Sequence, residues 1–223
     1  MNSKMDTNSK LNESYSNYYN IIKQKLPYKF AYLDDWLLKQ SEMLSQETDN
    51  IKKKENKNIQ STYRVYKRGT IIKIDFGIGL GSEMSQIHFA IVLNNYDNPK
   101  NNVLTIIPLT SKKHKYNLSL GNLVVKELIN NLEKEITKIG IKEEFNFNIA
   151  ENNRKFQKIT TIMSYYKTNI KDTYACTGMI TTISKTRIIK PINEYDVIGK
   201  IKCSPKILDM IDKEILDKIT KNT

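Results

Sequence analysis

Three short apolar runs decide the fold: TIIKIDF at Thr70–Phe76, HFAIVLN at His88–Asn94 and VLTIIPL at Val103–Leu109. All three are rich in β-branched residues, and the first alternates apolar and polar side chains, which is typical of a β-strand. Glycine- and asparagine-rich loops separate the runs, and no helical periodicity lies between them. Because parallel strands need a long crossover connection, these runs predict antiparallel pairing in a barrel or sandwich.

Helical patterns flank the strands on both sides. We expect helices at Tyr15–Gln24 and Phe30–Glu47, and a charged linker at Asn50–Ile59. A further helix is expected from Asn122 to Gly140. The last one starts at Ser204-Pro205, because an N-cap side chain there precedes a proline at the first helical position.

Two more strands are expected in the second half of the chain, around Ile159–Tyr165 and at Tyr174–Ser184. The glycines Gly77, Gly79 and Gly81 lie between two predicted strands with no helix after them. They therefore indicate a turn and not a nucleotide-binding loop.

The chain is basic, with a net charge of +12 over 223 residues. Residues 61–121 contain eight basic and three acidic side chains, a surplus of +5, and the run SKKHKY directly follows Thr110. A basic surface raises the local concentration of polyanions and speeds their capture. The charge is therefore consistent with nucleic-acid binding, although many basic proteins bind none.

Cysteine usage and hydropathy bear on the compartment. Cys176 and Cys203 have neither zinc-site spacing nor the density of a disulfide scaffold, so we expect buried thiols in a reducing environment. No apolar run approaches the roughly 18 residues that span a bilayer, and the polar segment Met1–Tyr19 is unlike a secretory signal. We therefore expect a cytoplasmic protein without a membrane partner.

The order of several motifs resembles the MazF/PemK toxin family. In that family an Arg-Gly pair precedes the first strand, a Gly-Ser-Glu loop follows it, and the third strand ends in Pro-x-Thr-Ser. Near the C-terminus come a Thr-Ile-x-Lys-x-Arg segment and a Gly-Lys pair. The matching residues here are Arg68-Gly69, Gly81-Ser82-Glu83, Pro108–Ser111, Thr182–Arg187 and Gly199-Lys200.

The resemblance implies a fold and an activity. We expect an α+β protein: a small SH3-like antiparallel β-barrel with an N-terminal helical extension, an inserted helix and a C-terminal helix. Residues 1–60 would form the extension and linker, and residues 61–223 the barrel domain with an insertion at about 121–171. The implied activity is cleavage of single-stranded RNA by attack of the ribose 2′-OH, without a metal or another cofactor. The implied partners are the RNA substrate, a cognate antitoxin (protein or RNA) and a second copy in a homodimer.

The resemblance also assigns residues. His88 stands where many members of the family have a catalytic Arg, and Thr110 matches a catalytic Thr. Ser111 adds a second hydroxyl. Glu83 orients either His88 or its own loop, and the alternative is a surface carboxylate without a role in the site. The expected catalytic residues are His88, Thr110, Ser111 and Glu83, and the expected RNA-binding residues are Arg68, Ser82, Lys112, Lys113 and His114.

Departures from the family pattern leave a second function open. Besides the Arg-to-His exchange at position 88, a Gln and an Arg of the family are missing at Gly178–Thr182. One hypothesis is a growth-inhibiting endoribonuclease toxin. The alternative is a catalytically inactive barrel that binds nucleic acid or an antitoxin.

Overall fold

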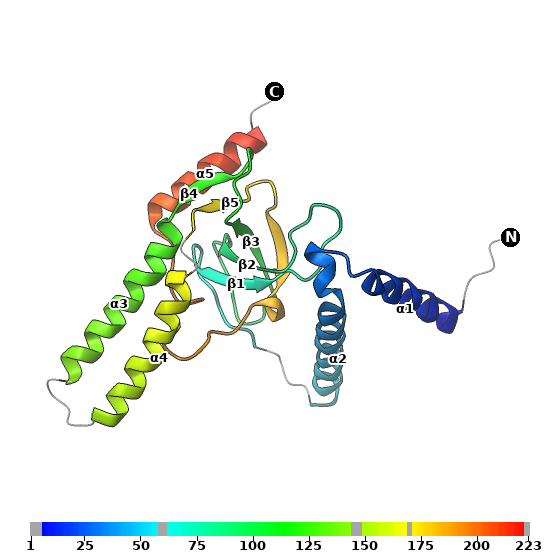
Figure 1. Ribbon diagram of the computed structural model, residues 1–223, viewed down its shortest axis with the longest axis horizontal. Coiled ribbons are helices and arrows are strands. Elements are labelled where there is room, and N and C mark those ends of the chain that lie inside the picture. Colours follow the sequence, from blue (N-terminus) through cyan, green and yellow to red (C-terminus); the bar gives the residue numbers. More distant parts are fainter. Residues whose placement is uncertain (1–5, 58–61, 144–148, 169–170, 221–223) are drawn as a thin grey trace. The chain divides into compact units, whose positions relative to one another are not determined.

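The computed structural model describes residues 6–57, 62–143, 149–168 and 171–220, and it divides into two compact units (Figure 1). The first unit comprises residues 1–60 and the loop Phe76–Gln86, and the second comprises residues 61–75 and 87–223. The predicted domain boundary near residue 60 stays a prediction. No pattern in the sequence indicates that this loop belongs with the N-terminal helices.

The first unit is helical, with α1 (Thr7–Lys23), the 3-10 helix η1 (Tyr28–Tyr32) and α2 (Leu33–Lys57). Helix α1 begins earlier than predicted and α2 ends later than predicted, while the 3-10 helix η1 takes the expected start of the second helix. The Asp6 carboxylate caps α1 by accepting a 2.9 Å hydrogen bond from the Ser9 amide. The described part of the predicted linker continues α2, because this charged stretch lacks Gly and Pro and is rich in the helix formers Lys and Glu.

The second unit is built on one antiparallel sheet whose central strand is β3. Strand β2 pairs with one edge of β3, and β1 pairs with β2. On the other edge, β6 pairs with the first half of β3 and β5 with its last two residues, while β4 pairs with β5. The strands are β1 (Ile71–Asp75), β2 (Ile87–Val92), β3 (Val103–Thr110), β4 (Leu118–Gly121), β5 (Thr173–Ala175) and β6 (Thr181–Ser184).

The predicted α+β class, the antiparallel pairing and the three deciding strands are confirmed, but the closed barrel is wrong. The strand order is β1-β2-β3-β5-β4, and no strand of the described residues joins β1 back to β4. Irregular chain covers the outer edge of β1 instead. The Ile71 amide donates to the Ile201 carbonyl (3.0 Å), and the Gly199 amide donates to the Ile71 carbonyl (2.7 Å). These bonds satisfy the edge without closing the sheet.

Three helices supply the core against one face of the sheet: α3 (Leu123–Glu143), α4 (Ile149–Thr168) and α5 (Pro205–Thr220). Alternate strand residues point to this core, as the two-residue period of a strand requires. The buried cluster includes Ile71, Ile91, Ile107, Leu128, Leu132, Ile159, Ile162, Ile207 and Ile211.

Two predictions for the second half of the chain are wrong. The strand expected around Ile159–Tyr165 is part of α4, where Ile159, Ile162 and Tyr166 follow helical spacing and are buried. The single strand expected at Tyr174–Ser184 is two strands, β5 and β6. Between them the chain turns, and the Met179 amide donates to the Cys176 carbonyl (2.8 Å).

Both cysteines are buried free thiols, as expected. Burial raises the pKa of Cys176 and of Cys203 to about 11, so both stay protonated at neutral pH. Within the described residues, none of the helices has the length and hydrophobicity needed to cross a membrane.

Buried carboxylates hold the irregular chain beside β1. The Asp196 carboxylate accepts hydrogen bonds from the Tyr166 hydroxyl (2.8 Å) and from the Ile192 (2.9 Å) and Ile198 (3.0 Å) amides. Asp97 accepts from the Tyr66 amide (2.8 Å) and forms an ion pair with Lys185 at 2.8 Å. The side chains of this pair are 0% and 4% exposed, so both charges lie in a low-dielectric interior.

Removing one partner of the Asp97–Lys185 pair leaves the other charge buried and unpaired. We expect Asp97→Asn to lower the free energy of unfolding by about 3–5 kcal/mol at pH 7, measured by urea denaturation. Asp209→Asn, an exposed carboxylate of the same unit, should leave the urea midpoint nearly unchanged. Equal midpoints for the two variants would contradict the structural role of the pair.

The same pair predicts a pH dependence. Burial raises the pKa of the Asp97 carboxyl, but hydrogen bonds from Lys185 and from the Tyr66 amide outweigh it, so the pKa lies below its usual value. The stabilisation is therefore complete above the ordinary carboxyl pKa of about 3.9 and is lost as the pH falls through the lowered value. The stability gap between wild type and Asp97→Asn should shrink on acidification.

Candidate active site

His88 lies where the ladder between β2 and β3 stops. The last pair of that ladder is Ala90 with Pro108, and the same register continued by two residues places His88 opposite Thr110. The half-buried imidazole donates from Nδ1 to the Leu109 carbonyl at 3.2 Å. A carbonyl can only accept, so this bond fixes the proton on Nδ1, and the lone pair of the neutral ring is on Nε2.

Thr110 ends β3 beside this imidazole. Its backbone pairs with Tyr174 of β5, so its position is fixed from the edge opposite to β2. Its hydroxyl accepts a 3.1 Å hydrogen bond from the Lys112 amide, which turns the chain sharply out of the strand. The structure thus brings the His88 ring to the backbone just before Thr110, with the exposed Ser111 directly after Thr110. Their joint catalytic role stays a prediction.

The basic run after Ser111 is an exposed turn that is anchored at its far end. Lys112, Lys113 and His114 are exposed, and the His114 ring lies against Tyr116 with 5.5 Å between centroids. The Tyr116 carbonyl accepts a 2.6 Å hydrogen bond from the Lys218 ammonium of α5. Cationic and aromatic side chains on one fixed turn are suited to phosphates and bases of a single strand.

The Gly-Ser-Glu loop belongs to the first unit and is closed by its own side chains. The Glu83 carboxylate accepts from the Leu80 amide at 2.9 Å, and the Ser85 hydroxyl accepts from the Gly79 amide at 3.0 Å. Of the two roles predicted for Glu83, these contacts agree with the ordering of its own loop. Ser82 is exposed near the loop's tip.

Two residues of the N-terminal extension hold this loop, and sequence reasoning missed both. The Lys29 ammonium donates to the Gly79 carbonyl (2.6 Å) and the Gly81 carbonyl (2.9 Å). The Trp36 indole packs on Gly77 so closely that a Cβ there would lie 2.2 Å from the ring. A lysine and an apolar helix position carry no sequence signal for contacts with a loop some 40–50 residues away.

Arg68 is engaged elsewhere. Its guanidinium donates to the Leu93 carbonyl and to the Asp212 carboxylate of α5. Leu93 lies five residues along from His88, which corresponds to about 16 Å of extended chain at ~3.3 Å per residue. The structure therefore separates Arg68 from His88. Arg68 instead links the sheet to α5.

Comparison with protein families matches residues 67–142 to the family described as PemK-like, MazF-like toxin of type II toxin-antitoxin system. About a third of the chain, residues 67–142, is therefore similar to PemK-like toxins. The match spans 76 of the 223 residues and contains β1 to β4 and all of α3 except its last residue. A search among curated proteins found no match.

The PemK-like segment contains His88, Thr110 and the basic turn, so these candidate site residues lie inside the matching segment. The inserted segment also differs from the expectation of one helix, because it contains a pair of neighbouring helices, α3 and α4 (Figure 1). The description of the family as part of a type II system implies an antitoxin partner for PemK-like toxins.

The contact between Trp36 and Gly77 predicts an asymmetric response to substitution. Gly77 and Gly81 both have positive φ angles, +70° and +51°, but of these two only Gly77 has another side chain, Trp36, in the space of an added Cβ. Gly77→Ala should expel the indole from the loop, whereas Gly81→Ala meets only backbone strain of about 1–2 kcal/mol. Trp36 is the chain's single tryptophan, so its fluorescence reports directly. A red shift is expected for Gly77→Ala alone, and identical spectra for both variants would refute the packing.

The engagement of Arg68 with α5 predicts a structural phenotype. Its ion pair is partly exposed, so Arg68→Gln should lower stability by about 1 kcal/mol, a drop of roughly 2–4 °C in Tm. RNA affinity should stay near that of wild type in the same preparation, measured by fluorescence anisotropy. A large loss of RNA affinity with unchanged Tm would restore the predicted RNA-binding role.

Proposed function

We propose that this chain is the toxin of a toxin–antitoxin system and acts as an endoribonuclease on single-stranded RNA without a metal. The observation that carries the proposal is the imidazole of His88 beside Thr110 at the end of β3, within the PemK-like segment. A histidine can accept and donate protons near neutral pH, which the Arg usual in the family does poorly. The exchange at position 88 is therefore compatible with acid–base chemistry.

The chemistry assigns a role to each group. His88 accepts the proton of the ribose 2′-OH, and the resulting alkoxide attacks the adjacent phosphorus. The P–O5′ bond breaks, and O5′ takes a proton from the imidazolium or from solvent. The products are a 2′,3′-cyclic phosphate and a 5′-OH. The hydroxyl of Thr110, with that of Ser111, donates to the phosphorane oxygens as negative charge builds up on them.

Substrate capture falls to the turn that follows. Lys112, Lys113 and His114 are exposed and close in sequence to Thr110, so they meet the phosphates on either side of the scissile bond. An exposed lysine is a point charge that binds any phosphate. This arrangement therefore favours RNA in general and leaves sequence preference to other contacts.

The partners follow from the same reading. An antitoxin that covers the turn and His88 would block RNA binding, and the homodimer implied by the family resemblance stays a prediction.

A different hypothesis is that the N-terminal helices themselves act as an antitoxin-like cover. It predicts that removal of residues 1–60 increases toxicity in cells.

Cleavage by purified protein in the presence of EDTA tests the function. We expect a single-stranded RNA to be cut into fragments whose 5′ ends accept phosphate from a kinase without prior phosphatase treatment. His88→Ala should reduce the rate by about 10²–10⁴-fold, and Thr110→Val by about 10²-fold. Thr105→Val, the same substitution earlier in β3, is the matched control and should retain activity.

The alternative function has its own signature. A protein that binds RNA with strong salt dependence and leaves it intact would be a binding module and not a nuclease. Intact cellular RNA and normal growth on induction of the wild-type chain would sink the toxin proposal altogether.

A further inference from the structure

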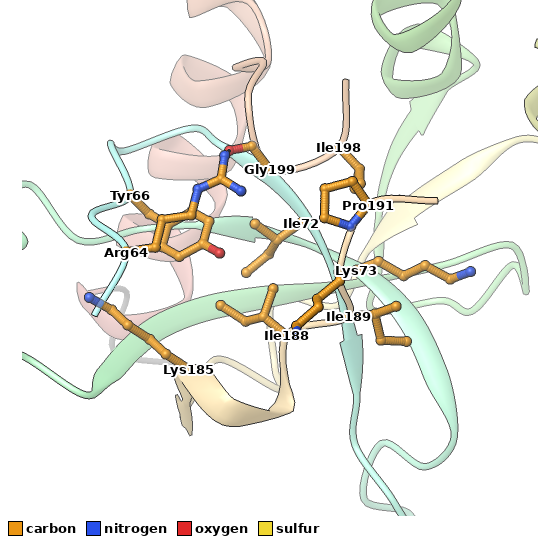
Figure 2. Close-up of a pocket in the computed structure, with 11 residues that line it drawn as sticks. Arg64, Tyr66, Ile72, Lys73, Lys185, Ile188, Ile189, Pro191, Ile198 and Gly199 are labelled. Atoms are coloured by element: carbon orange, nitrogen blue, oxygen red, sulfur yellow. Dashed lines mark hydrogen bonds between the residues drawn. The ribbon is translucent and has the colours of Figure 1, made fainter. Parts of the chain in front are cut away.

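A pocket with a volume of about 210 Å³ lies beside the outer edge of β1 (Figure 2). Its walls come from the segment before β1, from β1 itself and from the irregular chain between β6 and α5. Lys185 on its rim belongs to the Thr-Ile-Ser-Lys-Thr-Arg motif, which the site at His88 does not use. All of the lining residues belong to the second unit.

The interior of the pocket is apolar with one aromatic wall. Figure 2 shows Ile72, Ile188, Ile198 and Pro191 around its centre, with Tyr66 opposite Pro191. Burial raises the pKa of the Tyr66 hydroxyl above its usual value, so this group is protonated and able to donate a hydrogen bond. A planar ring bound in this pocket would contact apolar walls, the aromatic ring of Tyr66 and a hydroxyl that can donate a hydrogen bond.

The rim is cationic. Four basic side chains and no acidic one line the pocket, although two of them are turned to other partners. The Lys73 ammonium donates to the Tyr165 hydroxyl (2.5 Å) and Lys185 pairs with Asp97, and both ammonium groups point away from the centre in Figure 2. Arg64 and Lys190 are exposed and remain to meet a ligand at the mouth.

Arg64 is held in place for such a contact. Its guanidinium donates from Nη2 to the Gly199 carbonyl (2.6 Å), and Cζ lies 5.1 Å from the centroid of the Tyr66 ring. A guanidinium carries five N–H donors in a fixed plane, so one bond to a carbonyl orients the others. Orientation in advance lowers the entropy that a bound anion would otherwise cost.

The size of the pocket limits the ligand. Sites for whole drug-sized molecules measure about 300–1,000 Å³, so this pocket takes one ring system of a larger molecule. A planar apolar group attached to an anion matches an apolar interior under a cationic rim. Proteins bind single-stranded RNA through splayed bases that stack on aromatic or Arg side chains.

We propose that this pocket binds one nucleotide of the RNA strand, with the base between Tyr66 and the isoleucine walls and the phosphate on Arg64 and Lys190. The inference rests on RNA being the substrate, and it adds a subsite away from the scissile bond. Ile72 lines the pocket, and Ile74, two residues along β1, pairs with His88 of β2. One strand therefore links the subsite to the catalytic imidazole.

Methyl NMR on the full chain tests the assignment directly. The His88→Ala variant with ¹³C-labelled isoleucine methyl groups is titrated with each ribonucleoside 5′-monophosphate and with a single-stranded RNA pentamer. We expect shifts at Ile72, Ile188 and Ile198, and none at Ile207 and Ile211 in the core below α5. The pentamer should bind at least tenfold more tightly than any mononucleotide, because its other phosphates meet the basic turn.

Three variants make the test specific. Arg64→Gln should weaken mononucleotide binding about tenfold, whereas Arg154→Gln on the exposed surface of α4 removes the same charge and should change it less than twofold. Ile189→Trp fills the half-buried wall and should abolish the shifts while the α5 methyl signals stay in place.

The failures of the two proposals can be told apart. Wild-type protein that leaves RNA uncut overturns the nuclease but says nothing against shifts at the pocket methyl groups. Pocket methyl groups that ignore both ligands, or equal effects of Arg64→Gln and Arg154→Gln, overturn the subsite even if RNA is cut. Two results overturn the assignment to an RNA strand. In the first, mononucleotides bind with the same affinity as the pentamer. In the second, an acidic peptide displaces the pentamer from the pocket, and this displacement depends on Arg64.

Discussion

The pairing of β3 on both of its edges is the constraint on which the second unit depends. One edge is taken by β2, and the other is divided between β6 and β5. The strand therefore ends inside the sheet, where Thr110 is held by Tyr174 although its ladder to β2 has already stopped at Pro108. The register of the β2–β3 ladder, continued by two residues beyond its last pair, places His88 opposite Thr110. The candidate active site is thus a by-product of where one ladder ends.

Buried charge replaces regular structure along the outer edge of β1. The chain from Lys185 to Cys203 contains little helix or strand, yet it forms the wall of a pocket. Asp97 holds its start at Lys185, and Asp196 holds its middle by accepting hydrogen bonds from the Ile192 and Ile198 amides. A buried carboxylate is costly without partners, and these two have several each. Irregular chain can then be as fixed as a strand without presenting an edge to other molecules.

The sequence predicted what depends on short-range pattern and missed what depends on distant contacts. Strands β1 to β3 follow from β-branched alternation, and the neighbourhood of His88 and Thr110 follows from motif order. The sequence pattern predicts β5 and β6 as one strand, because the turn at Gly178 interrupts a run of residues that favour strands on both sides of it. The partners of Lys29 and Arg68 lie 50 and 144 residues away, and no periodicity encodes them. The open sheet was also beyond reach, since closure depends on the path of chain with no regular pattern.

The close packing of Trp36 on Gly77 has a consequence for how the loop and the N-terminal helices evolve. The loop needs glycine at this position because an indole from the N-terminal helices occupies the space of a side chain. A relative without those helices keeps only the positive φ as a reason for that glycine. A chimaera whose exchanged loop carries a side chain there would push that side chain into the indole. We therefore expect the helical extension and the loop to be inherited together, and a chimaera or deletion variant should exchange or remove both.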